Sequence, residues 1–189
     1  NDEKMELLKR AEEFSYAMEK VWDNNFGAYL NYRTDVDSLS KRVSPTMFYP
    51  LLAELGYKGR AGLIVKHFYD PNEFYGDWML PSTTRNDPLF PKQRYWKGAI
   101  WPPLNFLTYL SLRQAGFYSA ASELSGKSLK LIMIEWNRKG YVSENYSSIT
   151  GTGDDKRLSS DRFHSWGALF GIMSFMENGY LERFEKQIK

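Results

Sequence analysis

One acidic side chain, Glu144, stands in a stretch that otherwise holds hydroxyls, amides, glycines and aromatics, YVSENYSSITGTG at residues 141–153. A carboxylate set among polar groups can take a proton from water and act as a general base. The same pattern also fits a solvated loop, rich in serine and glycine, in which the acid has no role. The choice between these interpretations depends on which other residues the fold brings to this loop.

The composition excludes several other kinds of site. The sequence contains no cysteine, which excludes disulfides, thiol catalysis and thiolate metal sites. The two histidines, His67 and His164, lie far apart in the sequence, so we expect no metal centre, and we interpret His67 as structural. A net charge of +2, with the two signs well mixed, gives no basic face for nucleic acid.

The 189 residues are enough for one domain with a hydrophobic core, and 42% apolar with 25% charged residues is ordinary for a globular protein. No apolar run approaches the roughly 20 residues that a membrane span requires, and the first ten residues do not resemble a signal peptide. We therefore expect a soluble protein, with the cytoplasm favoured. The chain starts at Asn1 rather than Met, which is compatible with the removal of upstream sequence.

Two stretches show contrasting helical patterns. Between residues 3 and 22, apolar residues recur at steps of three and four, which predicts an amphipathic outer helix; they are Leu7, Ala11, Phe14, Met18 and Val21. Residues 100–115 carry almost no charge and predict an inner helix buried nearly all round. Pro102 and Pro103 fit the first turn of that helix, where amide hydrogens have no partner within the helix.

A glycine followed by an aromatic residue ends three helical stretches, at Gly56, Gly116 and Gly179, which are spaced 60 and 63 residues apart. Glycine readily takes the left-handed conformation that closes a helix. The near-constant spacing predicts a repeated unit of outer helix, long loop and inner helix, over residues 3–55, 58–115 and 118–178.

The long loops, at residues 23–43, 69–99 and 137–162, all connect an outer helix to an inner one. We expect all three to emerge on one face, which such an arrangement favours as the binding face. AYLNY at residues 28–32 alternates like a short strand, so we expect small β-hairpins in these loops.

Three motifs occur in a fixed order: RYWKGAIWPPLN at residues 94–105, SENYSSITG at 143–151 and FHSWGAL at 163–169. Together they resemble glycoside hydrolase family 63 and its relatives in the trehalase-like group, over roughly residues 75–175. This order is more specific than any single motif. The resemblance implies an all-α (α/α)6 toroid, in which six inner helices are ringed by six outer ones.

The resemblance also implies a function, the inverting hydrolysis of α-linked glucosides or mannosides, and identifies Glu144 with the general base. Neighbouring Ser143 and Ser147 would bind sugar hydroxyls or orient the water, and Tyr141 would offer a ring face. The substrate-binding residues implied are Tyr95, Trp96, Trp101, Asn105, Asn145, Tyr146, His164 and Trp166. Core packing is the alternative interpretation of the tryptophans.

The general acid that the resemblance implies, an aspartate in an upstream motif, has no match. WDNNFG at residues 22–27 begins similarly but lacks the Ser-Gly pair, so we interpret Asp23 as a loop residue and hold Asp77 in reserve. The mechanism requires no cofactor.

Three units make half of a six-unit ring, and a half ring would expose the apolar sides of its end helices. We therefore expect residues 1–189 to form a single domain, the C-terminal half of a larger catalytic barrel, with an oligosaccharide or glycoside as substrate. The remaining N-terminal half would close the ring and supply the acid. Two alternatives stay open: a short protein of which two copies close the ring, and an open helical arc that binds carbohydrate or a protein without hydrolysis.

Overall fold

A computed structural model describes residues 2–55 and 59–180. These form five α-helices, α1 (Asp2–Glu19), α2 (Arg60–Tyr69), α3 (Pro102–Gln114), α4 (Tyr118–Lys139) and α5 (Leu169–Glu177). Three 3-10 segments accompany them, η1 (Pro45–Ala53), η2 (Phe90–Lys92) and η3 (Ser165–Ala168). The prediction of a helical protein is confirmed, although the inner segment of the first unit is a 3-10 helix interrupted by Pro50 rather than an α-helix.

The helices alternate between an inner and an outer set in the predicted order. The inner helix α3 lies between η1 and α5, and the outer helix α4 packs against both α3 and α5. Outer helix α2 packs against η1 in the same way. The predicted turn glycines Gly116 and Gly179 both have a positive φ, +80° and +66°. The third predicted turn, at Gly56 and Tyr57, lies outside the described residues.

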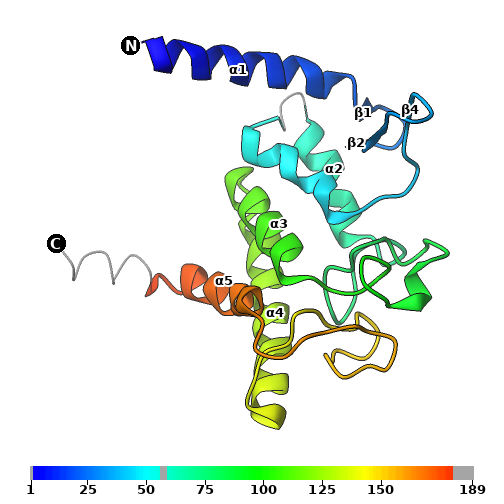
Figure 1. Ribbon diagram of the computed structural model, residues 1–189. Coiled ribbons are helices and arrows are strands. Elements are labelled where there is room, and N and C mark those ends of the chain that lie inside the picture. The colour runs from blue at the N-terminus through cyan, green and yellow to red at the C-terminus, as the bar shows by residue number, and fades with distance from the viewer. Residues whose placement is uncertain (1, 56–58, 181–189) are drawn as a thin grey trace.

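All three long loops emerge on the side of the molecule that lies to the right in Figure 1, away from the end of α5. The first loop contains two small hairpins, in which β1 (Trp22–Asp23) pairs with β2 (Ala28–Tyr29) and β3 (Tyr32–Arg33) with β4 (Ser38–Leu39), both antiparallel. In the register of the first hairpin, Trp22 lies opposite Tyr29. The prediction of short hairpins is confirmed for this loop. Among the described residues, the β-structure of the later loops consists of isolated bridges and includes no hairpin strands.

The core lies between the two sets of helices. Phe48 of η1 meets Phe68 of α2 and Phe74 edge-to-face, with ring centroids 6.3 and 5.5 Å apart. Further along the molecule, Tyr109 of α3 and Phe170 of α5 are fully buried. Burial of such aromatic rings supplies much of the free energy that holds the hairpins together.

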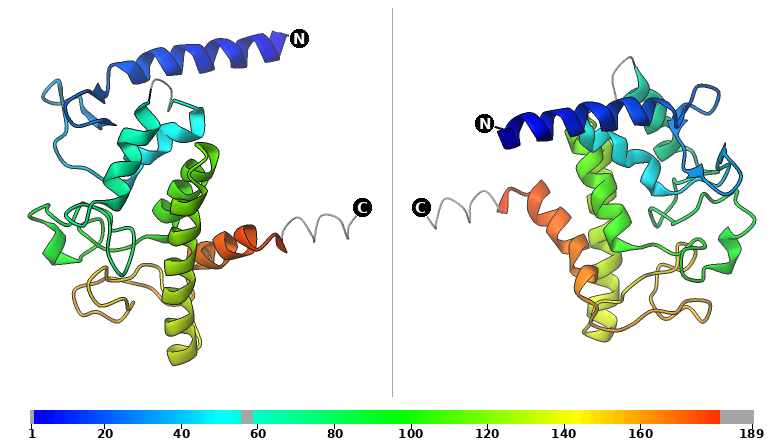
Figure 2. Two further views of the ribbon diagram at one scale, coloured as in Figure 1. Left: turned by 180° about the vertical axis from the view of Figure 1, so that it is seen from behind. Right: turned by 45° about the horizontal axis from the view of Figure 1, so that its top comes forward.

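The expected burial of the first helix is wrong for this chain. Helix α1 has no buried residue, and the side chains of Leu7 and Phe14, on its predicted inner face, are 58% and 49% exposed. Of the predicted stripe, only Met18 in the last turn of α1 and Val21 just after the helix pack against the core. Figures 1 and 2 show α1 extending along one end of the molecule. The apolar stripe is present, but no other element of the described chain covers its N-terminal part, which includes Leu7 and Phe14.

Helix α3 also departs from the expectation that it is buried nearly all round. Asn105, Tyr109 and Leu112 are fully buried on one face, but Leu107 is 37% exposed and Leu110 is half-buried. The helix has neighbours on η1, α4 and α5, and these cover only part of its circumference.

Within the described residues, no helix combines the length and apolar character needed to cross a membrane.

Candidate active site

The second and third long loops are joined directly by their backbones. Ile100, just before α3, pairs with Tyr146: the Ile100 amide donates to the Tyr146 carbonyl at 2.7 Å and the Tyr146 amide donates back at 3.0 Å. On its other side, Ile100 pairs with Pro81. The third loop folds back on itself, since the Glu144 amide donates to the Asp161 carbonyl at 2.9 Å. These pairings bring the three sequence motifs to one place.

A continuous group of tryptophans forms where the motifs meet. The rings of Trp96 and Trp101 stack with centroids 4.0 Å apart, and Trp101 meets Trp166 edge-to-face at 6.0 Å. The Trp101 indole also donates to the Tyr95 carbonyl at 3.0 Å. Trp101 is only 1% exposed, because Trp96 and Trp166 cover it, whereas Trp96 is 42% exposed. Trp96 therefore presents the open ring face of this group.

Glu144 lies at the Trp166 end of the tryptophan group. The Trp166 indole donates to the Glu144 carbonyl at 3.2 Å, which fixes the backbone that carries the acid. Oε2 of Glu144 accepts from the Asn145 side chain at 3.3 Å, and Oε1 lies 3.9 Å from His164 Nε2. His164 in turn packs on Trp166, with ring centroids 4.3 Å apart. With 17% of its side chain exposed, Glu144 is held in place yet reachable by water.

Two predicted binding residues support the site from the core instead of facing a ligand. Tyr146 is fully buried against Phe170, its hydroxyl accepts from the Ser143 amide at 3.0 Å, and burial raises its pKa to about 12. Asn105 is also fully buried. Its side-chain oxygen accepts from the Leu80 amide, and its side-chain nitrogen donates to the Leu80 carbonyl. Neither side chain is open to a sugar in this structure.

Asn145 and Tyr141 also depart from the expected arrangement. Asn145 is fully buried, and its side-chain amide donates to the Ser159 carbonyl at 2.9 Å. It therefore holds the Glu144 carboxylate from inside the loop and does not face a ligand. The ring of Tyr141 packs on Phe163 at 5.2 Å and beside Lys139. The remaining predicted residues, Tyr95, Trp96, Trp101, His164 and Trp166, do lie together with Glu144.

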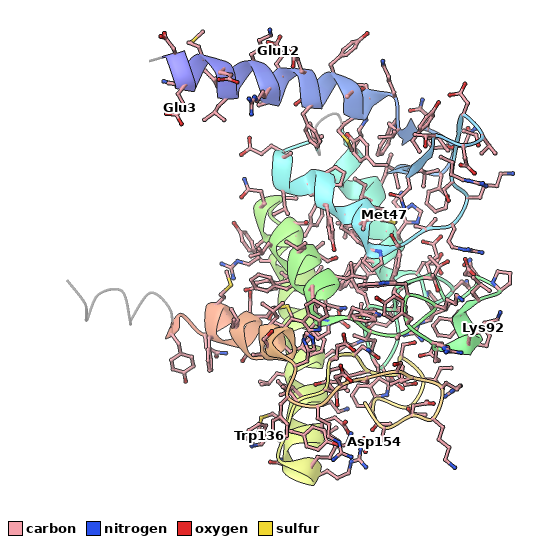
Figure 3. All side chains as sticks on the ribbon, viewed as in Figure 1. Glu3, Glu12, Met47, Lys92, Trp136 and Asp154 are labelled. Atoms are coloured by element: carbon pink, nitrogen blue, oxygen red, sulfur yellow. The ribbon has the colours of Figure 1, made fainter. Side chains whose placement is uncertain are left out.

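An ion-pair network that could not be predicted from the sequence attaches the third loop to helix α4. Figure 3 labels one of its members, Asp154, on the loop beside the last turns of α4. Glu135 of α4 is 1% exposed, pairs with Arg138 at 2.8 Å and with Lys139, and accepts from the Gly153 amide at 2.9 Å. Asp154 pairs with Lys139 at 2.7 Å. Burial alone would raise the pKa of the Glu135 carboxyl, but the hydrogen bonds from Lys139, Arg138 and Gly153 hold it below its ordinary value.

A hollow of about 290 Å³ adjoins the open side of Trp96. Its wall combines Trp96 and Leu104 with hydroxyl groups from the first and second loops, including Ser40, Ser44 and Ser82. The first loop thus reaches the same region as the tryptophan group. This combination of a ring face and hydroxyls suits a ligand with both polar and apolar faces.

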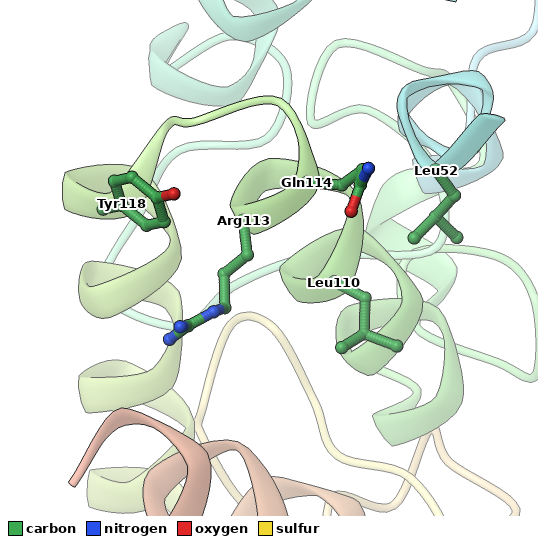
Figure 4. Close-up of a pocket in the computed structure, with 5 residues that line it drawn as sticks. All are labelled: Leu52, Leu110, Arg113, Gln114 and Tyr118. Atoms are coloured by element: carbon green, nitrogen blue, oxygen red, sulfur yellow. The ribbon is translucent and has the colours of Figure 1, made fainter. Parts of the chain in front are cut away.

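Another hollow, of about 410 Å³, lies at the opposite end of α3 (Figure 4). The described residues that line it are Leu52, Leu110, Arg113, Gln114 and Tyr118, and none of these is a carboxylate that could act as an acid or a base. Asp77, the reserve candidate for the general acid, lines a third hollow with Trp78 and Arg85. In the described part of the chain, no group of His, Cys, Asp or Glu residues could hold a metal ion.

The comparisons with known proteins agree with the motifs. The sequence model of the mannosylglycerate hydrolase MGH1-like glycoside hydrolase domain matches residues 1–166. A mannosylglycerate hydrolase of Thermus thermophilus is 29% identical over 139 residues, 72% of this chain and 31% of the relative. A mannosyl-oligosaccharide glucosidase of Saccharomyces cerevisiae is 34% identical over 121 residues, 56% of this chain and 14% of the relative.

Solved structures share the fold. A family 63 mannosylglycerate hydrolase from Thermus thermophilus, in complex with glucose, superimposes with a TM-score of 0.69 at 25% identity, over 84% of this chain and 36% of that one. A neutral trehalase from Saccharomyces cerevisiae gives a TM-score of 0.67 at 22% identity, over 86% and 29% of the two chains. The chain therefore spans little more than a third, at most, of the length of these relatives.

Proposed function

Because the chain belongs to the family of MGH1-like glycoside hydrolases, we propose that it carries the general base of an enzyme that cleaves α-linked glucosides or mannosides with inversion, and that this base is Glu144. The observation that carries the proposal is the position of Glu144. Its backbone is held by Trp166, its carboxylate is tethered by Asn145, and both adjoin the tryptophan group. A base needs a fixed carboxylate with access for water, and this one has both.

The chemistry follows from that geometry. A water bound at Oε1 of Glu144 loses a proton to the carboxylate as its oxygen attacks the anomeric carbon from the face opposite the leaving group. A general acid across the sugar protonates the leaving oxygen, and in inverting enzymes the two carboxyl groups lie roughly 6.5–9.5 Å apart to leave room for the water. His164, 3.9 Å from Oε1, is placed to share in holding that water or a sugar hydroxyl.

The acid itself is assigned to another part of the full-length protein. Asp23, which the sequence analysis set aside, accepts from the backbone amides of Asn25 and Phe26 at 2.8 and 2.9 Å, as a turn residue does. Asp77 lines a hollow with Trp78 and Arg85, and neither Glu144 nor Trp96 lines that hollow. We assign the acid to an aspartate in an upstream segment.

The same proposal accounts for the exposed apolar surface. The described chain would form the C-terminal half of an (α/α)6 barrel, and the remaining helices, or those of a second copy, would cover the stripe of α1 that includes Leu7 and Phe14. Apolar side chains that are exposed in one chain typically mark a site where another part of the protein or a partner packs. The share of the matched relatives that this chain spans, 36% in the complex with glucose, is consistent with a larger catalytic unit.

The experiment that tests the function uses the full-length protein and α-linked substrates of both sugars, mannosylglycerate and a glucosyl disaccharide among them. The proton NMR spectrum of the first product shows which anomer is released. We expect β-glucose or β-mannose to appear first and then mutarotate. Release of the α anomer first would refute inversion, and the absence of either sugar would refute the hydrolase function.

Replacement of Trp96 tests the proposed sugar-stacking face. Trp96→Ala removes a ring that is 42% exposed while leaving Glu144 and its partners untouched. We expect KM to rise about 10-fold, which corresponds to the loss of about 1.4 kcal/mol of binding, with kcat changed much less. Steady-state kinetics measures both. Trp136→Ala is the matched control, because Trp136 is 50% exposed on α4 and lies outside the group. Equal effects of the two substitutions would argue against a stacking role.

A further inference from the structure

Gln93 is a fully buried polar residue that lies between the second and third loops. It directly follows η2, is 0% exposed, and has a left-handed backbone with φ of +49°. Its side-chain nitrogen donates to the Phe90 carbonyl at 2.8 Å. Burying an amide in this way is costly unless its hydrogen bonds are made, so its partners define what it does.

The oxygen of the Gln93 amide is used entirely by the third loop. Oε1 accepts from the Ser148 amide at 2.8 Å and from the Ser147 hydroxyl at 3.3 Å, and the Ser148 hydroxyl oxygen lies 3.1 Å away. Ser147 and Ser148 follow the proposed base Glu144 by three and four residues. A single side chain of one loop therefore binds two donors, the Ser148 amide and the Ser147 hydroxyl, of the segment that carries the base.

The same amide also packs against the segment that carries the tryptophans. A Cβ atom placed on Gly98 would lie 2.6 Å from Nε2 of Gln93 and 2.4 Å from the Phe90 carbonyl oxygen, so only glycine allows this close approach. The Gly98 carbonyl accepts from the Ser148 hydroxyl at 2.8 Å. Gly98 lies between Trp96 and Trp101 in the sequence. The Gln93 amide thus meets both halves of the candidate site.

From these contacts we propose that Gln93 is a positioning residue, which sets the Glu144 loop relative to Trp96 and Trp101 without touching the substrate. The inference rests on the proposed function, because it assigns Gln93 a role in that hydrolysis. A base must sit within a fraction of an ångström of its working position, and a misplacement of about 1 Å can cost 100-fold in rate. The backbone pairing of Ile100 with Tyr146 sets the register of the two loops, and Gln93 fixes the turn that follows.

The test compares three variants of the full-length protein. Gln93→Met keeps nearly the same volume but removes both the acceptor and the donor, whereas Gln93→Glu keeps an acceptor for Ser147 and Ser148. Gln114→Met is the matched control, because the Gln114 amide binds Glu54 at 2.9 Å on the surface, away from the loops. We expect Gln93→Met to lower kcat between about 10- and 100-fold with KM within about 3-fold. Gln93→Glu should retain more activity than Gln93→Met, and the control should match the wild type.

Two further readouts separate positioning from simple unfolding. In the Glu144→Gln background, Gln93→Met should still bind the unhydrolysed α-linked disaccharide with one site per chain, as measured by calorimetry. Hydrogen exchange should be faster at the Ser148 amide, which loses its acceptor, than at Ile100 and Tyr146, which keep theirs.

Two kinds of result would overturn the inference. If the wild type is active and Gln93→Met has an unchanged kcat, the positioning role alone is overturned. The same holds if kcat falls only by the fraction of chains that have lost the ability to bind the disaccharide. A wild type that hydrolyses no α-linked glucoside or mannoside would overturn the proposed function and the role with it.

Discussion

The substitution Glu144→Gln is expected to lower kcat by about 10³-fold while the dissociation constant of the substrate stays within about 3-fold of the wild type. Glutamine keeps the size and hydrogen-bonding capacity of the side chain but cannot accept the proton of the attacking water. The contacts that hold this position, from Trp166 to the backbone and from Asn145 to the side chain, leave the amide in nearly the same place. Steady-state kinetics and calorimetry measure the two quantities.

The control for this substitution is Glu12→Gln on the exposed polar face of α1, which should leave both quantities unchanged. A Glu144→Gln protein that hydrolyses at the wild-type rate would exclude Glu144 as the base. The result would also distinguish the competing hypothesis of a carbohydrate-binding helical arc, because such a protein binds its ligand equally well with either residue and shows no turnover to lose.

Of the substitutions considered, Lys139→Met is expected to cause the largest loss in the free energy of unfolding. The Lys139 side chain is 6% exposed and pairs with Glu135, itself 1% exposed, and with Asp154 at 2.7 Å. Lys139→Met leaves the buried Glu135 carboxylate with only Arg138 and the Gly153 amide. Removing one partner of a buried pair costs about 3 kcal/mol in the free energy of unfolding. Urea unfolding of the full-length protein measures this cost, and a loss no greater than that of the exposed Lys9→Met control would contradict it.

The same pair makes a prediction for pH. Because the pKa of Glu135 is held below its ordinary value in the folded protein, its ion pairs stabilise the fold at neutral pH. That stabilisation is complete above the unfolded pKa of glutamate, near 4.3, and is lost as the pH falls through the lower folded value. Lys139→Met removes part of this effect. The difference in unfolding free energy between wild type and variant should therefore narrow as the pH is lowered.

Local patterns were sufficient to predict much of the fold. The stretch at residues 100–115, which carries almost no charge, contains α3, with Pro102 and Pro103 in its first turn, and Gly116 follows its end with a positive φ. These features depend on neighbours within a few residues, so the sequence displays them. The burial of α1 could not be predicted in the same way, because it depends on a surface that no described element of this chain supplies.

The candidate site was predictable only in part. The three motifs identified Glu144, Trp96 and Trp166, and the structure brings these together. A motif does not say which of its residues point into the core, and so Tyr146 and Asn105 were expected to face a ligand although both are fully buried.

Gln93 and Glu135 escaped the sequence analysis altogether. Gln93 meets Ser148 across 55 residues of sequence, and Glu135 meets Gly153 across 18. A buried glutamine or glutamate has no local pattern that distinguishes it from a solvated one. Only the folded chain shows that both hold the loop of the proposed base.

The most direct test of the central claim is a crystal structure of the full-length Glu144→Gln protein with an α-linked substrate bound. We expect a sugar ring beside Trp96 and Trp166. A water should lie within hydrogen-bonding distance of residue 144, on the face of the anomeric carbon opposite the glycosidic oxygen, and an aspartate from outside residues 1–189 should contact that oxygen. A substrate bound away from the tryptophan group, or a different carboxylate in contact with the water, would contradict the assignment of Glu144 as the general base.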